Sequence, residues 1–192
     1  MITLIIVDCQ NDFITGTMSV KGAKNAVEEI KKFIKNKKKE IDKIIFTVDW
    51  HPYNHVSFKK YGGKWPQHCV QYTPGACIEP KLLKFVQSLA IDYEVSQKGY
   101  DPCFEQYGAF DYIELVQDAT RNHYYFDSIV SADATTDFVV CGIAGEYCVK
   151  STIENMIEEN IIPKIFIPGI ISIDGGRIFN KFIKEKGLEK IS

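Results

Sequence analysis

Short runs of apolar residues recur along the chain, each bounded by polar or turn-forming residues. Runs of this length that are apolar at successive positions are typical of parallel strands buried on both faces. We therefore predict strands at Thr3–Asp8, Lys43–Asp49, Phe138–Cys141 and Lys164–Pro168, with a further strand at Tyr93–Lys98. Three of these strands end in a charged residue, which is a costly place for a charge unless it has a partner.

Between the strands, apolar residues recur at the three- and four-residue spacing of helices. The spacing predicts helices beginning after Gly22, over Pro80–Ala90, beginning near Cys148, and over Arg177–Lys186. Phe110–Val116 is a further candidate helix, whereas residues 117 to 135 show no clear pattern. The segment Trp50–Thr73 is long, aromatic and irregular, and segments of this kind inside a compact domain usually have a function.

Strands that alternate with helices indicate an α/β fold, with a mostly parallel sheet flanked by helices on both faces. The length of 192 residues fits one domain, and the composition of 45% hydrophobic and 25% charged residues is ordinary for a globular protein. The net charge of −2 gives no electrostatic reason to expect nucleic acid or an anionic membrane as a partner. No apolar stretch approaches the roughly 20 residues of a membrane span.

The cysteine pattern bears on the cellular compartment. The apolar segment Met1–Val7 is ended by Asp8 and no cleavage-site pattern follows, so we expect no signal peptide. None of the six cysteines forms a CxxC pair, which argues against a zinc ribbon and a dithiol redox motif. We therefore expect reduced thiols in a cytoplasmic protein.

Three candidate catalytic residues follow predicted strands. Asp8 and Lys98 end two of them, and Cys148 lies just after a third, in the first turn of a predicted helix. The carboxyl ends of parallel strands meet at one edge of a sheet, so these groups are expected to converge. A carboxylate can accept the thiol proton, an ammonium can hold that carboxylate ionised, and a helix start favours a thiolate. Taken singly, Asp8 as a loop cap, Lys98 as a surface residue and Cys148 as a packing residue remain alternatives.

A candidate metal site comprises Asp49, His51 and His68. Carboxylate and imidazole suit zinc, or iron and manganese, and three protein ligands would leave positions open for water or substrate. The D-x-H spacing alone is a weak signal. His55 is a candidate fourth ligand, but a structural hydrogen-bonding role is at least as well supported. His123 lies in a polar stretch and is assigned no role.

These segments together resemble the nicotinamidases (pyrazinamidases) of the isochorismatase-like cysteine hydrolase superfamily. The matching pieces keep the family's order over about three-quarters of the chain, so their combination is far more specific than any one of them. They are VDCQNDF (7–13), TVDWHPYNHVSF (47–58), KWPQHCVQYTPGA (64–76), KGYDPCFEQYGAF (98–110) and GIAGEYCVKST (142–152).

The resemblance implies a single isochorismatase-like hydrolase domain over residues 1–192, with a three-layer fold and a six-stranded sheet. It implies Asp8, Lys98 and Cys148 as a catalytic triad, and Asp49, His51 and His68 as ligands of one zinc-like ion (Zn²⁺, Fe²⁺ or Mn²⁺). It further implies that Phe13 and Trp65 sandwich the substrate ring. A cis peptide before Ala144 would let the N–H groups of Ala144 and Cys148 form an oxyanion hole.

The implied activity is hydrolysis of nicotinamide to nicotinate and ammonia, which feeds NAD salvage, and Lys98→Ala is expected to damage turnover more than folding. One alternative is a relative that acts on another small amide or an N-carbamoyl compound. Another is a catalytically silent protein with a reactive thiol. The chain departs from the family where relatives often show A-T-D-Y-C and this chain has A-G-E-Y-C, at Ile171–Gly176, and over residues 111–130. The oligomeric state, including a homo-oligomer, is left open.

Overall fold

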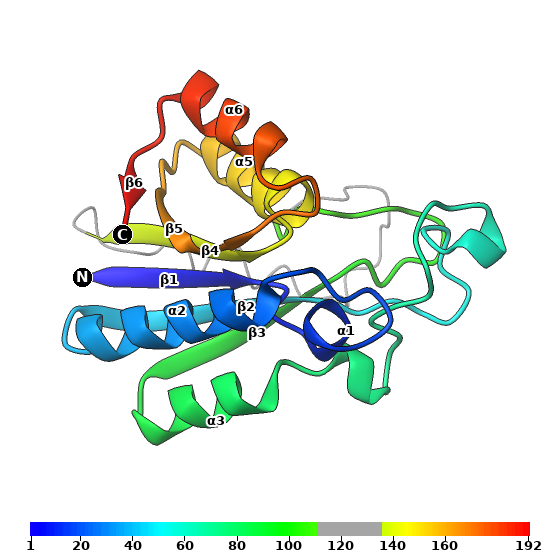
Figure 1. The fold of residues 1–192 in the computed structure, drawn as a ribbon, viewed down its shortest axis with the longest axis horizontal. Helices are drawn as coiled ribbons and strands as arrows, with labels where there is room; N and C mark the ends of the chain where they lie inside the picture. The colour runs from blue at the N-terminus through cyan, green and yellow to red at the C-terminus, as the bar shows by residue number, and fades with distance from the viewer. Residues whose placement is uncertain (111–135) are drawn as a thin grey trace, which may run out of the picture.

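The computed structural model describes residues 1–110 and 136–192. Its centre is a six-stranded sheet in the order β3-β2-β1-β4-β5-β6, in which every neighbouring pair is parallel (Figure 1). The strands are β1 (Ile2–Val7), β2 (Ile41–Asp49), β3 (Asp92–Lys98), β4 (Asp137–Ile143), β5 (Lys164–Ile171) and β6 (Lys190–Ile191). This confirms the parallel α/β fold predicted from the sequence.

Helices cover both faces of the sheet, which Figure 1 shows edge-on. On one face lie α2 (Ala23–Lys37) and α3 (Pro80–Ser88), and on the other lie α5 (Lys150–Glu158) and α6 (Arg177–Lys186). A short helix α1 (Asn11–Ile14) follows β1. Three further turns of helix interrupt the loops, namely η1 (Lys59–Tyr61), η2 (Pro74–Ala76) and η3 (Gly145–Val149).

The apolar pattern of β1 explains why this strand is central. All six of its residues are buried. Leu4 and Ile6 pack in the cluster that contains the inner faces of α2 and α3, whereas Ile5 and Val7 pack with α5 and α6. Because successive side chains point to opposite faces, a strand covered on both sides is apolar at nearly every position, and in β1 only Thr3 is polar.

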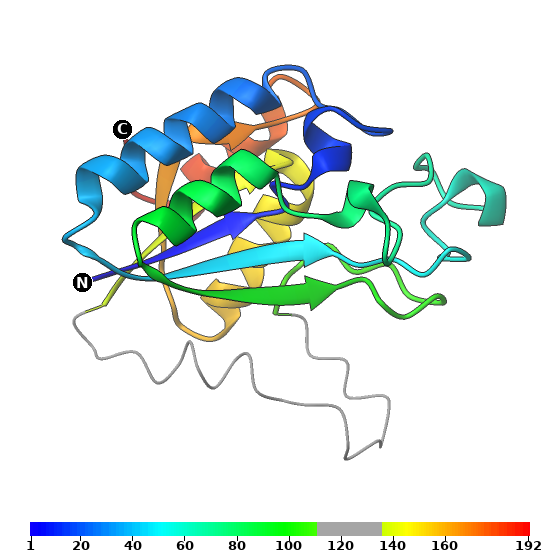
Figure 2. The same ribbon diagram turned by 90° about the horizontal axis from the view of Figure 1, so that it is seen from below.

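The parallel register brings the candidate residues to one edge of the sheet. Asp49, the last residue of β2, pairs with Lys98, the last residue of β3. Val7 pairs with Thr47 on one side and Gly142 on the other, so Asp8 follows directly at the same level. Figure 2 shows the arrowheads of β1, β2 and β3 pointing toward the same end of the molecule.

Some element boundaries differ from the predicted ones. β5 continues to Ile171 rather than ending at Pro168, because the β4–β5 pairing shifts register between Val140 and Gly142. An irregularity of this kind accommodates a proline that cannot donate to the ladder. The predicted loop after Gln10 contains α1, and β6 was not predicted. The predicted helix Phe110–Val116, apart from its first residue, lies outside the described residues, as does His123.

Among the described residues, no helix is both long enough and apolar enough to cross a membrane.

Candidate active site

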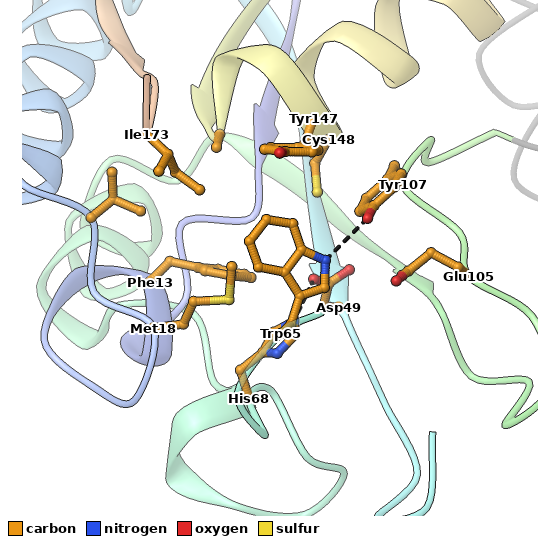
Figure 3. A pocket seen from close by; sticks show the side chains of 12 residues that line it. Phe13, Met18, Asp49, Trp65, His68, Glu105, Tyr107, Tyr147, Cys148 and Ile173 are labelled. Carbon is orange, nitrogen blue, oxygen red and sulfur yellow. Dashed lines mark hydrogen bonds and ion pairs between the residues drawn. The ribbon is translucent and has the colours of Figure 1, made fainter. Parts of the chain in front are cut away.

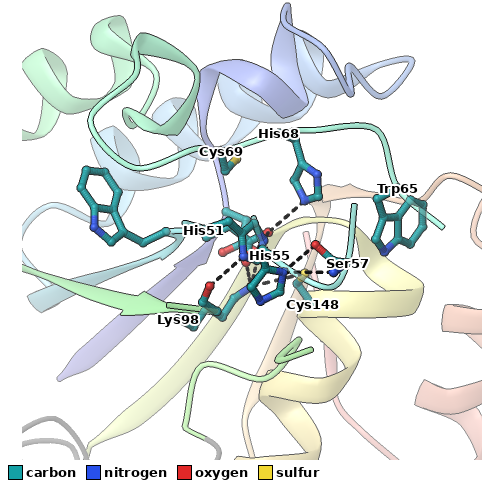
Figure 4. A network of polar contacts seen from close by, with 12 residues as sticks. His51, His55, Ser57, Trp65, His68, Cys69, Lys98 and Cys148 are labelled. Atoms are coloured by element: carbon teal, nitrogen blue, oxygen red, sulfur yellow. Dashed lines mark hydrogen bonds and ion pairs between the residues drawn. The ribbon is translucent and has the colours of Figure 1, made fainter. Parts of the chain in front are cut away.

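The polar network shown in Figure 4 includes Lys98, whose side chain has no exposed surface. Its ammonium lies 2.8 Å from Asp8 Oδ2 and 3.5 Å from Cys148 Sγ, and it also forms an ion pair with Asp49 Oδ1. Asp8 after β1, Lys98 at the end of β3 and Cys148 in the turn after β4 thus meet, as the sequence predicted. Burial opposes the charge, but the two carboxylates outweigh it and raise the pKa of Lys98 well above its usual value.

Asp8 uses its two carboxylate oxygens differently. Oδ1 accepts a hydrogen bond from Thr47 Oγ1 at 2.8 Å. Oδ2 faces Lys98 as an ion pair but receives no directed hydrogen bond from any described residue. Burial raises the pKa of Asp8, with Lys98 acting in the opposite direction. The backbone of Asp8 has φ of 50°, in the left-handed region that non-glycine residues seldom adopt and that is often found at functional sites.

Cys148 lies in η3, a π-helical turn between β4 and α5, and its side chain is buried. Burial raises the pKa of the Cys148 thiol well above its usual value, against the opposing effect of Lys98, and Asp8 raises it further. The sequence suggested that the helix start favours a thiolate, but burial beside carboxylates favours the thiol in the resting site. A nearby base is therefore needed to release the sulfur nucleophile. The Ile143–Ala144 peptide just before this turn is cis, as the resemblance implied.

The predicted metal ligands also meet. His51 Nε2 and His68 Nε2 lie 3.5 Å and 3.7 Å from the same Asp49 oxygen, Oδ2. All three side chains are buried, and one ligand atom from each lies within 4.8 Å of the others. Burial alone would raise the pKa of Asp49, but Lys98 and the imidazoles hold it well below its usual value.

The Nδ1 atoms of His51 and His68 make contacts that fit a metal site. His51 Nδ1 lies 2.8 Å from the carbonyl oxygen of Gly99, and His68 Nδ1 lies 2.7 Å from that of Pro66. A carbonyl oxygen can only accept, so each Nδ1 donates to it, and each Nε2, on the side of Asp49, is the nitrogen that a bound ion would use. Two nitrogen donors and one carboxylate oxygen in this arrangement suit a zinc-like ion.

His55 does not join these three residues. Its Nδ1 lies 2.7 Å from Ser57 Oγ and its Nε2 lies 2.9 Å from the carbonyl oxygen of Phe104, so both ring nitrogens are engaged. The His55 ring packs against His51, with centroids 4.2 Å apart. Burial lowers the pKa of His55 to about 4, so its ring is neutral at pH 7. Of the two roles that the sequence left open, the hydrogen bonds favour the structural one.

A pocket opens beside these groups, and Figure 3 shows the Cys148 sulfur pointing into it. Phe13 and Trp65, which the resemblance implied as substrate contacts, both line it, as does Ala144. The remaining lining residues are Met18, Val20, Asp49, His68, Glu105, Tyr107, Tyr147, Cys148 and Ile173. An apolar and aromatic lining with few polar groups is typical of a small-molecule site.

Several supporting residues were not singled out from the sequence. The side chain of Gln10 brackets Asp49, donating to its carbonyl oxygen and accepting from its N–H, each at 2.8 Å. Asp12 accepts a hydrogen bond from the N–H of Cys69, next to His68, at 2.8 Å. Both residues lie in the VDCQNDF segment, and Glu105 and Tyr107 lie in KGYDPCFEQYGAF. Membership in these segments was the only signal that could have identified them.

A family model for the Isochorismatase domain matches residues 3–163, and the chain therefore belongs to the isochorismatase family. The chain is 29% identical to the nicotinamidase of Saccharomyces cerevisiae over 178 residues, which span 79% of each protein.

Solved structures of a pyrazinamidase and of PnC1 resemble this chain over its whole length. The pyrazinamidase of Pyrococcus horikoshii in complex with zinc is 27% identical, with a TM-score of 0.77 over 100% of this chain and 98% of that one. PnC1 from L. infantum in complex with nicotinate is 26% identical, with a TM-score of 0.77 over 100% of this chain and 92% of that one.

Proposed function

We propose that this chain is a metal-dependent amidase, a single hydrolase domain over residues 1–192, that hydrolyses nicotinamide to nicotinate and ammonia. The observation that carries the proposal is the convergence of Cys148, Asp8 and Lys98 beside three metal-type ligands, at a pocket with aromatic walls. The similarity to nicotinamidases and pyrazinamidases supports the choice of substrate.

In the first half of the reaction, Asp8 accepts the proton of Cys148 and the sulfur attacks the carboxamide carbon. The Asp8 carboxylate suits this role, because one of its oxygens lies within 4.8 Å of the Cys148 sulfur. Lys98 stabilises the ionised forms of both partners from 2.8 Å and 3.5 Å. The N–H groups of Ala144 and Cys148 would hold the developing oxyanion. Protonation of the leaving nitrogen by Asp8 then releases ammonia and leaves a thioester.

In the second half, Asp8 accepts a proton from water, whose oxygen attacks the thioester carbon. Cleavage of the carbon–sulfur bond releases nicotinate and restores the thiol, so one water is consumed for each amide cleaved. Phe13 and Trp65 would pack against the two faces of the pyridine ring. Asp49, His51 and His68 would hold one zinc-like ion, which when bound supplies a Lewis acid for the ring nitrogen.

We further propose a cytoplasmic location, in line with the six cysteines, all of which are free thiols.

The test is ammonia release from nicotinamide by the purified protein, with nicotinate identified as the product and an N-carbamoyl amino acid as competing substrate. We expect hydrolysis of nicotinamide that is lost with a chelator and restored by zinc. Cys148→Ala is expected to lower kcat by about 10³-fold or more, because the nucleophile is removed. The exposed Cys103 provides the matched control, and Cys103→Ala should keep full activity.

Turnover of the N-carbamoyl compound in place of nicotinamide would reject the substrate and keep the mechanism. Full activity of Cys148→Ala would reject the mechanism.

A further inference from the structure

Three aromatic side chains form one wall of the pocket, and each comes from a different segment. Trp65 lies between η1 and η2, Tyr107 follows β3, and Tyr147 precedes Cys148 in η3. The Trp65 indole N–H donates to the Tyr107 hydroxyl at 3.0 Å, which Figure 3 shows as a dashed line. Tyr147 packs edge-on against Trp65, with ring centroids 5.0 Å apart. It also packs against Tyr107 in a tilted arrangement, with centroids 5.5 Å apart. We call Trp65, Tyr107 and Tyr147 the aromatic wall.

The ammonium of Lys64 lies against all three members of this wall. It is 4.6 Å from the centroid of Trp65, 4.5 Å from that of Tyr147 and 5.6 Å from that of Tyr107. Each distance is within the range in which a cation is attracted to the face of an aromatic ring. Lys64 forms no ion pair with any other described residue, so its surroundings there are aromatic rather than acidic.

Hydrogen bonds fix the backbone on both sides of Lys64, although its side chain is exposed. The N–H of Lys59 donates to the Trp65 carbonyl at 2.8 Å, and the N–H of Trp65 donates to the Ser57 carbonyl at 3.0 Å. Gly63 lies so close to Ser57 that an added Cβ would fall 2.1 Å from its carbonyl group. The loop therefore doubles back at Gly63, and Lys64 starts from a fixed position beside the wall.

We propose that Lys64 is a positioning residue that holds Trp65, Tyr107 and Tyr147 against one another and so sets the affinity of the pocket for a flat aromatic amide. Its ammonium contacts one ring from each of three segments: Trp65 from the loop that carries His68, Tyr107 from the loop after β3, and Tyr147 from the turn that carries Cys148. The part that concerns the substrate depends on the proposed function. The wall contacts the ring of the substrate rather than the reacting carbon, so ground state and transition state lose the same contact when it loosens.

Steady-state kinetics of Lys64 variants test the effect on the substrate. For Lys64→Met we expect KM for nicotinamide to rise roughly 2- to 5-fold with kcat nearly unchanged, the size that an exposed cation–π contact allows. Lys64→Arg keeps the cation and should restore KM, whereas Lys64→Gln should not. Lys60 is the matched control, since its ammonium lies over Tyr61 alone, 5.5 Å from the centroid, and Lys60→Met should leave KM unchanged.

Fluorescence provides a readout that needs no turnover. The chain has two tryptophans, so a Trp50→Phe background leaves Trp65 as the only one. In that background we expect Lys64→Met to increase quenching of Trp65 by acrylamide, Lys60→Met to leave it unchanged, and Lys64→Arg to return it to the parent value. Unchanged quenching in Lys64→Met would overturn the proposal, whether or not the protein hydrolyses nicotinamide. A fall in kcat at constant KM, or a Lys64→Gln variant equal to Lys64→Arg, would also overturn it.

An inactive parent protein with the expected quenching pattern would instead reject the proposed function and keep the role of Lys64 in the wall.

Discussion

Lys98 shows how a single residue links catalysis to stability. Its ammonium is fully buried and faces the carboxylates of Asp8 and Asp49. A buried charge of this kind costs free energy on its own, and the two carboxylates offset that cost. Removing the lysine leaves two acidic groups in contact without a cation. The sequence indicated that a charge at this strand end needs a partner, but it did not show that one ammonium faces both carboxylates.

We therefore predict that Lys98→Met abolishes turnover and also lowers the free energy of unfolding by about 3–5 kcal/mol, the usual cost of breaking a buried pair. Adding Asp8→Asn should recover part of this loss, because one unpaired carboxylate is removed, without recovering activity. Urea denaturation of the chelator-treated protein measures both effects.

The pair Lys43–Glu94, which is partly exposed on neighbouring strands, supplies the control. Lys43→Met is expected to cost no more than about 1 kcal/mol. A double variant at Lys98 and Asp8 that is less stable than Lys98→Met alone would contradict this account of the network.

At the scale of whole elements, predictions succeeded where the pattern reflects burial. Five of the six strands were predicted, because strands covered on both faces must be apolar at successive positions, as β1 is. β6 has two residues and α1 has four, so neither is long enough to show a period. The turn η3 resembles the start of a helix in sequence, and only the structure shows that α5 begins two residues after Cys148.

A buried carboxylate connects η3 to the loop before α6. Glu146 Oε1 accepts from the N–H of Asp174 at 2.7 Å, and Oε2 accepts from the N–H of Ile173 at 3.2 Å. Ile173 lines the pocket, so this contact places part of its wall. Gly145 allows the close approach, because an added Cβ would fall 2.2 Å from Ser172 Oγ. The sequence AGEYC, where relatives often show ATDYC, is thus matched to the loop that it holds.

We predict that Glu146→Gln lowers the free energy of unfolding by about 1 kcal/mol, because an amide has only one acceptor oxygen for two partly buried N–H groups. KM should rise as Ile173 loses its fixed position. Chemical denaturation and steady-state kinetics measure the two effects.

Glu154, which pairs with Lys150 on the surface of α5, is the control, and Glu154→Gln should cost less than about 0.5 kcal/mol. Equal stability of the two variants would argue against a role for Glu146 in holding the loop.

For the molecule as a whole, the site divides into a part that topology determines and a part that loops supply. Asp8, Lys98 and Cys148 were predicted to meet because parallel strands end at one edge of the sheet. His68 reaches the same place through a loop held by Asp12, whose hydrogen bond to Cys69 has no periodic signal in the sequence. Glu105, Tyr107 and Ile173 also come from loops, so the pattern of apolar residues could not place them in the pocket.

The metal site gives a prediction for the stability of the entire fold. Asp49 ends β2, whereas His51 and His68 lie in the long loop that follows, so the three ligands assemble only in the folded chain. A ligand that binds only the folded state stabilises it by mass action, by about 2.7 kcal/mol at a free concentration of roughly 100 times Kd. We expect chelator-treated protein to melt at a lower temperature, and added zinc to restore the melting temperature at one ion per chain.

His68→Ala should lose the response to zinc. His55→Gln should melt at a lower temperature with and without zinc but keep the increment, because both ring nitrogens of His55 already have partners. Calorimetry with metal analysis decides between the two histidines: loss of the zinc increment in His55→Gln would make His55 a ligand, and no increment in the parent protein would reject the site.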